Sequence, residues 1–204
     1  MLESKFKLVF LFVVLACAAM PIIAILRGTT VTPYEEPRSG AAADVELVEE
    51  GAPGEEPLPS EMVTIPAGPF VRGTENGGFD ERPTRTIHLD EYSIDRFEVT
   101  NHQYQQFVVA TGHRKPGLPS RYAKSGAKVR GVNQPIVYVS WDDAEEYCRW
   151  KGKRLPTEAE WEKAMRGTDG RLWPWGEKER PDGANWARVN DGHEASARVG
   201  TFQI

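Results

Sequence analysis

The side chains that could do chemistry in this sequence are few, and its two cysteines come first. Cys17 lies inside an apolar N-terminal run, and Cys148 lies far along the chain in Glu-Glu-Tyr-Cys-Arg-Trp. Two cysteines in such different regions predict neither a disulfide framework nor a cysteine-rich metal site. We interpret Cys148 as a small buried hydrophobic side chain.

Three alternating carboxylates, Glu158, Glu160 and Glu162, are the next candidates, because paired acids can act as general acid and base. Thr157 directly precedes them and places them in the first turn of a predicted helix. Carboxylates there bond the free backbone amides and complement the helix dipole. A structural role is therefore the better interpretation.

The histidines and tryptophans give no catalytic or metal-binding pattern. None of the histidines has a metal-ligand spacing to another histidine or to a cysteine. They are His88, His102, His113 and His193. The tryptophans could form a sugar-stacking platform, but their helical and turn contexts favour core packing. They are Trp141, Trp150, Trp161, Trp173, Trp175 and Trp186.

Three helices must position these residues, and each has clear start and stop signals. The first follows Thr100 and ends at Gly112, with Tyr104, Phe107 and Val108 on its apolar face. The second follows Ser140 and ends at Gly152. Its inner face is predicted to hold Trp141, Ala144, Tyr147 and Cys148.

The third helix follows Thr157 and ends at Gly167, with Trp161, Ala164 and Met165 facing inward. Short strands are predicted from alternation and turn residues. They are 62–66, 85–89, 92–95 and 134–139. Short strands, small helices and Gly/Pro-rich loops together predict an irregular α+β fold.

The charge of the chain lies mainly in one segment. Residues 27–61 hold nine acidic and two basic side chains and several prolines, so we predict a disordered linker that tethers the domain. The domain that follows, 62–204, is nearly neutral and has no basic patch. No nucleic-acid partner is therefore expected.

The N-terminal segment 1–26 is predicted to anchor the chain as a transmembrane helix. Leu8 to Leu26 carries no charge and is just long enough to cross a bilayer, and Lys5 and Lys7 precede it. A lipoprotein signal ending at Cys17 and a cleaved signal peptide remain alternatives. All three place the domain outside the cytoplasm, in a periplasmic or extracellular location on the inner or plasma membrane.

Four motifs resemble the formylglycine-generating enzyme (sulfatase-modifying factor) family. The longest, 139–162, reads Val-Ser-Trp-Asp-Asp-Ala-Glu-Glu-Tyr-Cys-Arg-Trp-Lys-Gly-Lys-Arg-Leu-Pro-Thr-Glu-Ala-Glu-Trp-Glu. The others are Met-Val-Thr-Ile-Pro-Ala-Gly-Pro-Phe at 62–70, Tyr-Ser-Ile-Asp-Arg-Phe-Glu-Val-Thr-Asn at 92–101 and Trp-Pro-Trp-Gly at 173–176. The resemblance implies the family's variant of the C-type-lectin-like fold.

The resemblance also implies what lies outside this sequence. In the family's oxidases a Gly-Asn-x-Trp-Glu-Trp segment, a Gly-Gly-Ser segment and the copper-binding cysteine pair follow the position of Ile204. The fold is therefore expected to be incomplete at its C-terminus. No catalytic residue is assigned, and the copper site is expected to be absent. The chain alone is predicted to be inactive.

A calcium site is implied by resemblance to the family's calcium loop. The carried-over ligands are the Asn185 side chain, the Trp186 carbonyl, the Asp191 side chain and the His193 carbonyl. Oxygen donors of this mixed kind suit calcium. The alternative is a plain turn rich in Asn, Asp and Gly.

Two functions of different classes remain open at this point. One is a part of an oxidase that converts a cysteine in exported sulfatases to formylglycine. The other is a non-catalytic binding or accessory module on the same scaffold. The expected partners are the membrane and either a polypeptide that completes the domain or an exported protein substrate.

Overall fold

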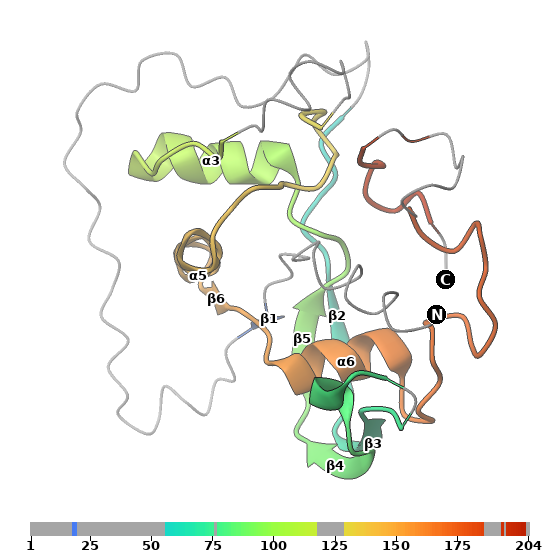
Figure 1. The fold of residues 1–204 in the computed structure, drawn as a ribbon. Helices are drawn as coiled ribbons and strands as arrows, with labels where there is room; N and C mark the ends of the chain where they lie inside the picture. Colours follow the sequence, from blue (N-terminus) through green and yellow to red (C-terminus); the bar gives the residue numbers. More distant parts are fainter. Residues whose placement is uncertain are drawn as a thin grey trace, which may run out of the picture.

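The computed structural model describes part of the chain, in which short strands and three helices alternate (Figure 1). The described residues are 18–19, 56–75, 77–117, 129–185, 193 and 195–202. Most of the predicted transmembrane segment and of the acidic linker lies outside them. Within the described ranges no helix is long and apolar enough to cross a membrane.

The three helices begin and end where the capping residues predict. α3 (Asn101–Thr111), α5 (Trp141–Trp150) and α6 (Glu158–Arg166) each follow a Thr or Ser whose side chain accepts a bond from the third helical N–H. In each helix the residue at that third position returns a bond to the cap's N–H, which completes a capping box. Gly112 ends α3 with a φ of 69°, which is the left-handed geometry that glycine adopts without strain.

A four-stranded sheet has the order β2-β5-β1-β6. β2 (Met62–Ile65) pairs with all four residues of β5 (Tyr92–Asp95). β1 (Ala18–Ala19) lies between β5 and β6 (Lys153–Arg154) and is antiparallel to both. The middle of this sheet therefore joins three distant parts of the sequence.

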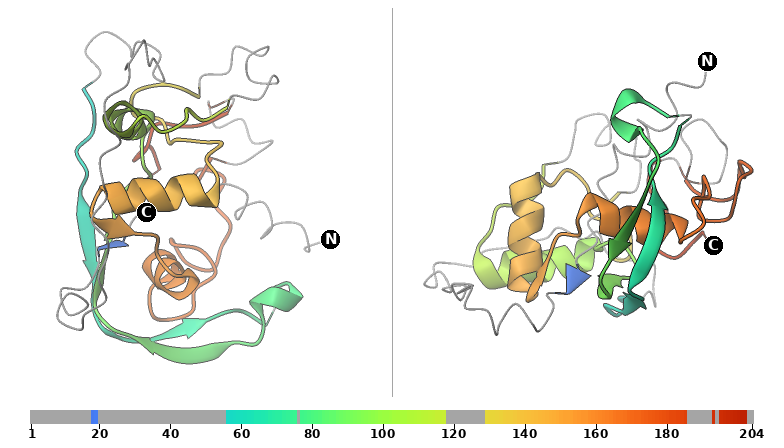
Figure 2. Two further views of the ribbon diagram at one scale, coloured as in Figure 1. Left: turned by 90° about the vertical axis from the view of Figure 1, so that its left-hand side faces the viewer. Right: turned by 90° about the horizontal axis from the view of Figure 1, so that it is seen from below.

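A separate hairpin of β3 (Gly68–Arg72) and β4 (Arg85–Leu89) runs past α6 and carries the 3₁₀ turn η1 (Phe79–Glu81) at its far end (Figure 2). The two strands pair along five residues, from Gly68 with Leu89 to Arg72 with Arg85. Prediction from the sequence found β4 but missed β3, because glycine and proline occupy its first two positions.

The core lies between α3 and α5. Tyr104 and Phe107 from α3 pack against Tyr147 from α5, with ring centroids 5.6 and 5.7 Å from that of Tyr147. Cys148 and Ala144 are also fully buried there. A second cluster joins Tyr92 and Ile94 of β5 to α6 through Trp161 and Ala164. The predicted apolar face of α3 is confirmed.

Two predicted details are wrong. Trp141 does not face the core. It is the first residue of α5, at the N-terminal end of the helix, and it is 64% exposed. Residues 134–139 form no strand and make one isolated bridge, between Pro135 and Thr100. Tyr138 has a positive φ of 62°, which an extended strand does not contain. Further along the chain, residues 199 and 200 form a turn, and the Val199 N–H donates to the Asn133 carbonyl at 2.9 Å.

Candidate functional site

Cys148, which the sequence suggested was a buried free thiol, is disulfide-bonded. It lies on the inner face of α5 and is completely buried. The sequence holds one other cysteine, Cys17, which lies outside the described residues. Copper(I) is held by free thiolates, and the described residues provide none, so they do not fit the family's copper site.

The three glutamates of α6 are structural, as predicted. Glu160 accepts two bonds from the Arg154 guanidinium at 2.7 and 2.6 Å, and one from the Thr157 N–H at 2.7 Å. Burial alone would raise the pKa of Glu160, but the bonds from Arg154 and Thr157 hold it below its usual range. A carboxylate with a lowered pKa whose oxygens already accept these bonds is poorly suited to proton transfer.

The other two glutamates of the helix hold the hairpin to α6. Glu158 pairs with Arg72 at 2.8 Å. Glu162 accepts the Gly73 N–H at 2.8 Å and also pairs with Arg166, which is buried. These carboxylates are occupied by partners in β3 and α6 and leave no acid-base pair facing a substrate.

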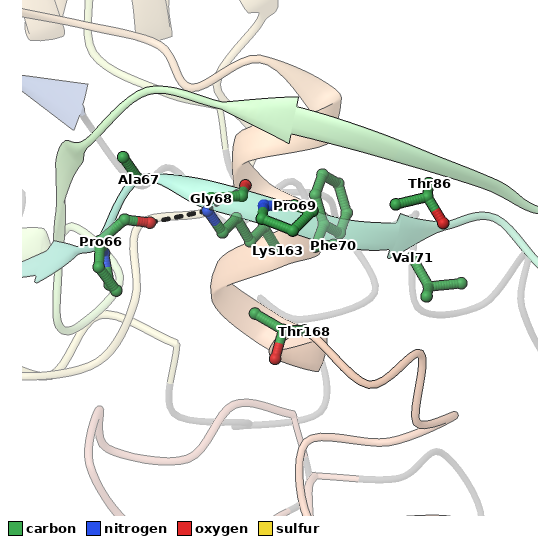
Figure 3. Close-up of a pocket in the computed structure, with 9 residues that line it drawn as sticks. All are labelled: Pro66, Ala67, Gly68, Pro69, Phe70, Val71, Thr86, Lys163 and Thr168. Carbon is green, nitrogen blue, oxygen red and sulfur yellow. Dashed lines mark hydrogen bonds between the residues drawn. The ribbon is translucent and has the colours of Figure 1, made fainter.

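A cavity beside β3 has a volume of about 450 Å³ (Figure 3). Its walls are apolar except for Lys163 and two threonines. They comprise residues 66–71, Thr86, Lys163 and Thr168. We name it the Lys163 pocket.

Lys163 crosses from α6 to β3 and is 3% exposed. Its Nζ donates to the Pro66 carbonyl at 2.7 Å and to the Gly68 carbonyl at 3.1 Å. The two carbonyls fix the ammonium at the pocket wall, and an ammonium has a third donor. The pocket therefore combines an apolar surface with one fixed cation, which suits binding rather than nucleophilic chemistry.

The residues of the calcium prediction are only partly described. Asn185 donates its Nδ2 to the Ala195 carbonyl at 3.2 Å, which leaves its oxygen as the atom a cation would require. His193 lies edge-on to Phe202, with ring centroids 6.0 Å apart. Trp186 and Asp191 lie outside the described residues. Among the residues described, no group of three or more histidine, cysteine or acidic side chains could hold a metal.

The tryptophan-rich turn is a packed structure. Trp173 and Trp175 stack with ring centroids 5.7 Å apart and an interplanar angle of 4°. Trp175 donates its indole N–H to the Lys178 carbonyl at 2.9 Å, and the Arg180 guanidinium lies 6.0 Å from its ring. The two rings stack on each other but are only half-buried and lie in neither core cluster, so core packing is not confirmed for them, and Trp141 is exposed.

Comparison with known proteins identifies the class to which this fold and these motifs belong. The family model "Sulfatase-modifying factor enzyme 1-like domain" matches residues 49–203. The chain therefore belongs to the formylglycine-generating enzyme family.

Three similar proteins show how much of a family member this chain covers. It is 35% identical over 201 residues to the formylglycine-generating enzyme of Bos taurus, covering 76% of this chain and 54% of that protein. It is 33% identical to the inactive Cα-formylglycine-generating enzyme 2 of Bos taurus, over 69% of this chain and 63% of that protein. The structure of PvdO from Pseudomonas aeruginosa matches with a TM-score of 0.57 and 28% identity, over 71% of this chain and 63% of that one. The chain thus spans between half and two thirds of these relatives.

Proposed function

We propose that this chain is the exported scaffold part of a formylglycine-generating enzyme and that it acts on exported sulfatases only together with a polypeptide that supplies the thiolate pair. The observation that carries the proposal is the state of Cys148 in a chain of this family. A disulfide-bonded cysteine cannot serve as a copper ligand, so Cys148 does not supply one of the thiolates.

Export is supported by the same disulfide, since disulfides persist in oxidising compartments outside the cytoplasm. The apolar run 8–26 behind Lys5 and Lys7 supports a membrane anchor. A molecule whose run 8–26 crosses a bilayer cannot also pair Ala18 with Ile94 of β5. Anchoring and sheet pairing are therefore alternative states of the N-terminal segment.

A reporter experiment tests export. Alkaline phosphatase fused after residue 61 is active only outside the cytoplasm, and β-galactosidase at the same position is active only inside. We expect phosphatase activity in the membrane fraction. Activity of the β-galactosidase fusion would overturn the export proposal, whereas phosphatase activity in the soluble fraction would favour a cleaved signal peptide.

A reconstitution experiment tests the enzymatic part. The chain is incubated with copper, a reductant and a Cys-x-Pro-x-Arg peptide, alone and after co-expression with the part of the Bos taurus enzyme that it does not match. Mass spectrometry should detect conversion of the peptide cysteine to the aldehyde only in the completed sample. The matching control carries the corresponding part of the inactive Bos taurus paralogue.

The second candidate is a non-catalytic accessory module on the same scaffold. An inactive paralogue among the similar proteins favours keeping it. The reading frame that follows the codon for Ile204 discriminates the two. A continuing frame with the cysteine pair favours the enzyme, and a frame without it favours the accessory module.

A further inference from the structure

Phe79 is the most exposed large apolar side chain in the described part of the chain, at 97%. It begins η1 at the tip of the β3–β4 hairpin (Figure 2). We use the name Phe79 tip for residues 73–75 and 77–84. Single exposed apolar residues are common on protein surfaces. The Phe79 tip is instead built rigidly.

Several hydrogen bonds hold the tip in one conformation. The Thr74 N–H donates to the Glu81 carbonyl at 3.0 Å, and the Gly78 N–H donates to the Glu81 carboxylate at 2.9 Å. The Arg82 guanidinium donates twice to the Gly77 carbonyl, at 3.0 and 2.7 Å. These bonds fix the backbone on both sides of Phe79 without covering its ring.

Glycine is required for this compact arrangement. A Cβ on Gly77 would lie 1.7 Å from the Glu81 carboxylate oxygen, and one on Gly73 would lie 2.6 Å from the Glu81 carbonyl oxygen. The tip therefore presents Phe79 from a backbone that is already ordered on folding. Aromatic residues held in this way are typical anchors of protein interfaces.

The Lys163 pocket has the complementary properties. It is apolar, its volume of about 450 Å³ is within the range of ligand pockets, and its fixed cation is Lys163. The Phe79 ring is directly followed by two carboxylates, Asp80 and Glu81. An incoming phenyl ring with a neighbouring acid thus matches an apolar pocket with an ammonium at its wall.

We propose that the Phe79 tip of one molecule docks in the Lys163 pocket of a second copy of this chain. The contact cannot be made within one molecule in this structure, because the Phe79 ring is almost fully exposed while the pocket lies along β3. Reciprocal insertion gives a two-fold dimer. A single aromatic anchor per contact predicts weak, concentration-dependent association. The proposal is independent of the enzymatic function proposed above.

Photo-crosslinking of the full-length chain tests this docking. Benzoylphenylalanine is introduced at position 79, and equal amounts of ¹⁴N- and ¹⁵N-labelled protein are mixed and irradiated. We expect mixed-isotope adducts between residue 79 and residues 66–71 or Thr168. Adducts within one molecule, adducts on other surfaces or the absence of dimeric adducts would overturn the proposal.

Two variants serve as matched controls. Thr168→Trp fills the pocket from an exposed position and should reduce the mixed-isotope adduct at least about fivefold, with an unchanged circular dichroism spectrum. The probe placed at the exposed Glu91, on the turn between β4 and β5, should give no pocket adduct. An unchanged adduct yield in Thr168→Trp would also contradict the proposal.

Discussion

The buried side chain of Asn133 accepts a hydrogen bond from the backbone N–H of Leu58 at 2.8 Å, across 75 residues of sequence. Its Nδ2 donates to the Glu56 carbonyl, also at 2.8 Å. Like the backbone of a neighbouring strand, the Asn133 amide offers one donor and one acceptor, and it holds the segment 56–58 just before β2. Part of the predicted linker is therefore fixed to the domain from Glu56 onward.

Asn133→Ala should release this segment, because both backbone groups lose their partners. An unpaired buried group costs about 1–3 kcal/mol. We expect amide hydrogen exchange at residues 56–61 to increase at least about tenfold. Gln106→Ala removes an amide from the exposed side of α3 and should leave that exchange unchanged. Equal exchange in both variants would contradict the role of Asn133.

Arg166 should be among the most sensitive positions in α6. It is 4% exposed and donates to the carbonyls of Arg171, Gly170 and Gly73 at 2.6, 2.8 and 3.1 Å. Removing one partner of a buried ion pair costs about 3–5 kcal/mol. Arg166→Met should therefore lower the free energy of unfolding by that order, measured by urea denaturation.

The matched control is Arg149→Met, which breaks an exposed pair with Glu145 at 3.3 Å. Exposed pairs contribute about 0.2–1 kcal/mol, so this variant should denature almost like the parent chain. Arg166→Lys keeps the charge but loses the fork of donors, and it should fall between the two. A parent-like curve for Arg166→Met would exclude the proposed role.

The pH dependence of stability should reveal Glu98. Burial raises the pKa of this carboxyl above its usual range, opposed by a bond to its own backbone. The folded state then holds the proton more tightly than the unfolded state, so stability falls as the pH rises from about 4.5 through the raised pKa. Glu98→Gln should remove this loss.

The measurement is the difference in unfolding free energy between Glu98→Gln and the parent chain from pH 4.5 to 8. That difference should grow with pH and favour the variant. Asp143 and Glu160 have lowered pKa values, with the opposite pH dependence, but they contribute equally to both proteins. Glu91→Gln, at an exposed position, should give a constant difference of nearly zero.

The disulfide state of Cys148 can be measured directly. Denatured protein treated with iodoacetamide without a reductant should gain no adduct, and after reduction it should gain two, one per cysteine. Intact mass spectrometry distinguishes these states. Alkylation of Cys148 in the unreduced protein would contradict both the disulfide and its use as support for export.

Calcium binding remains a prediction from the resemblance. Calorimetry should detect calcium binding by the full chain and its loss in Asp191→Ala. Asp182→Ala provides the control, because this neighbouring aspartate is exposed and paired with Arg180 at 3.0 Å. If the full chain binds no calcium, or if the two variants bind it equally, the calcium prediction is wrong and the segment is a plain turn.

The elements that could be predicted from sequence are those fixed by local interactions. The three capping boxes span only four residues each, so Thr100, Ser140 and Thr157 identify the helix starts correctly. The strands β2, β4 and β5 follow from short alternating patterns. The sequence motifs also identified the family, because they preserve both residue types and order.

The remaining features depend on contacts between distant residues. Lys163 reads as an ordinary surface lysine of a helix, yet β3 covers it. Nothing near Asn133 indicates that its amide binds Leu58. The disulfide of Cys148 was missed because the alternatives considered for Cys17 placed it in a membrane segment or a signal peptide. Such pairings become visible only when tertiary structure brings the partners together.

The strand order of the central sheet also has a kinetic consequence. Each helix closes only local contacts, whereas joining β5 to β6 through β1 brings together Ile94, Arg154 and Ala18. Sheets with such high contact order form slowly, while helices form within microseconds. During that interval the inner edge of β5 exposes unpaired backbone groups. Aggregation during refolding should therefore begin at β5 and should decrease when the protein concentration is low.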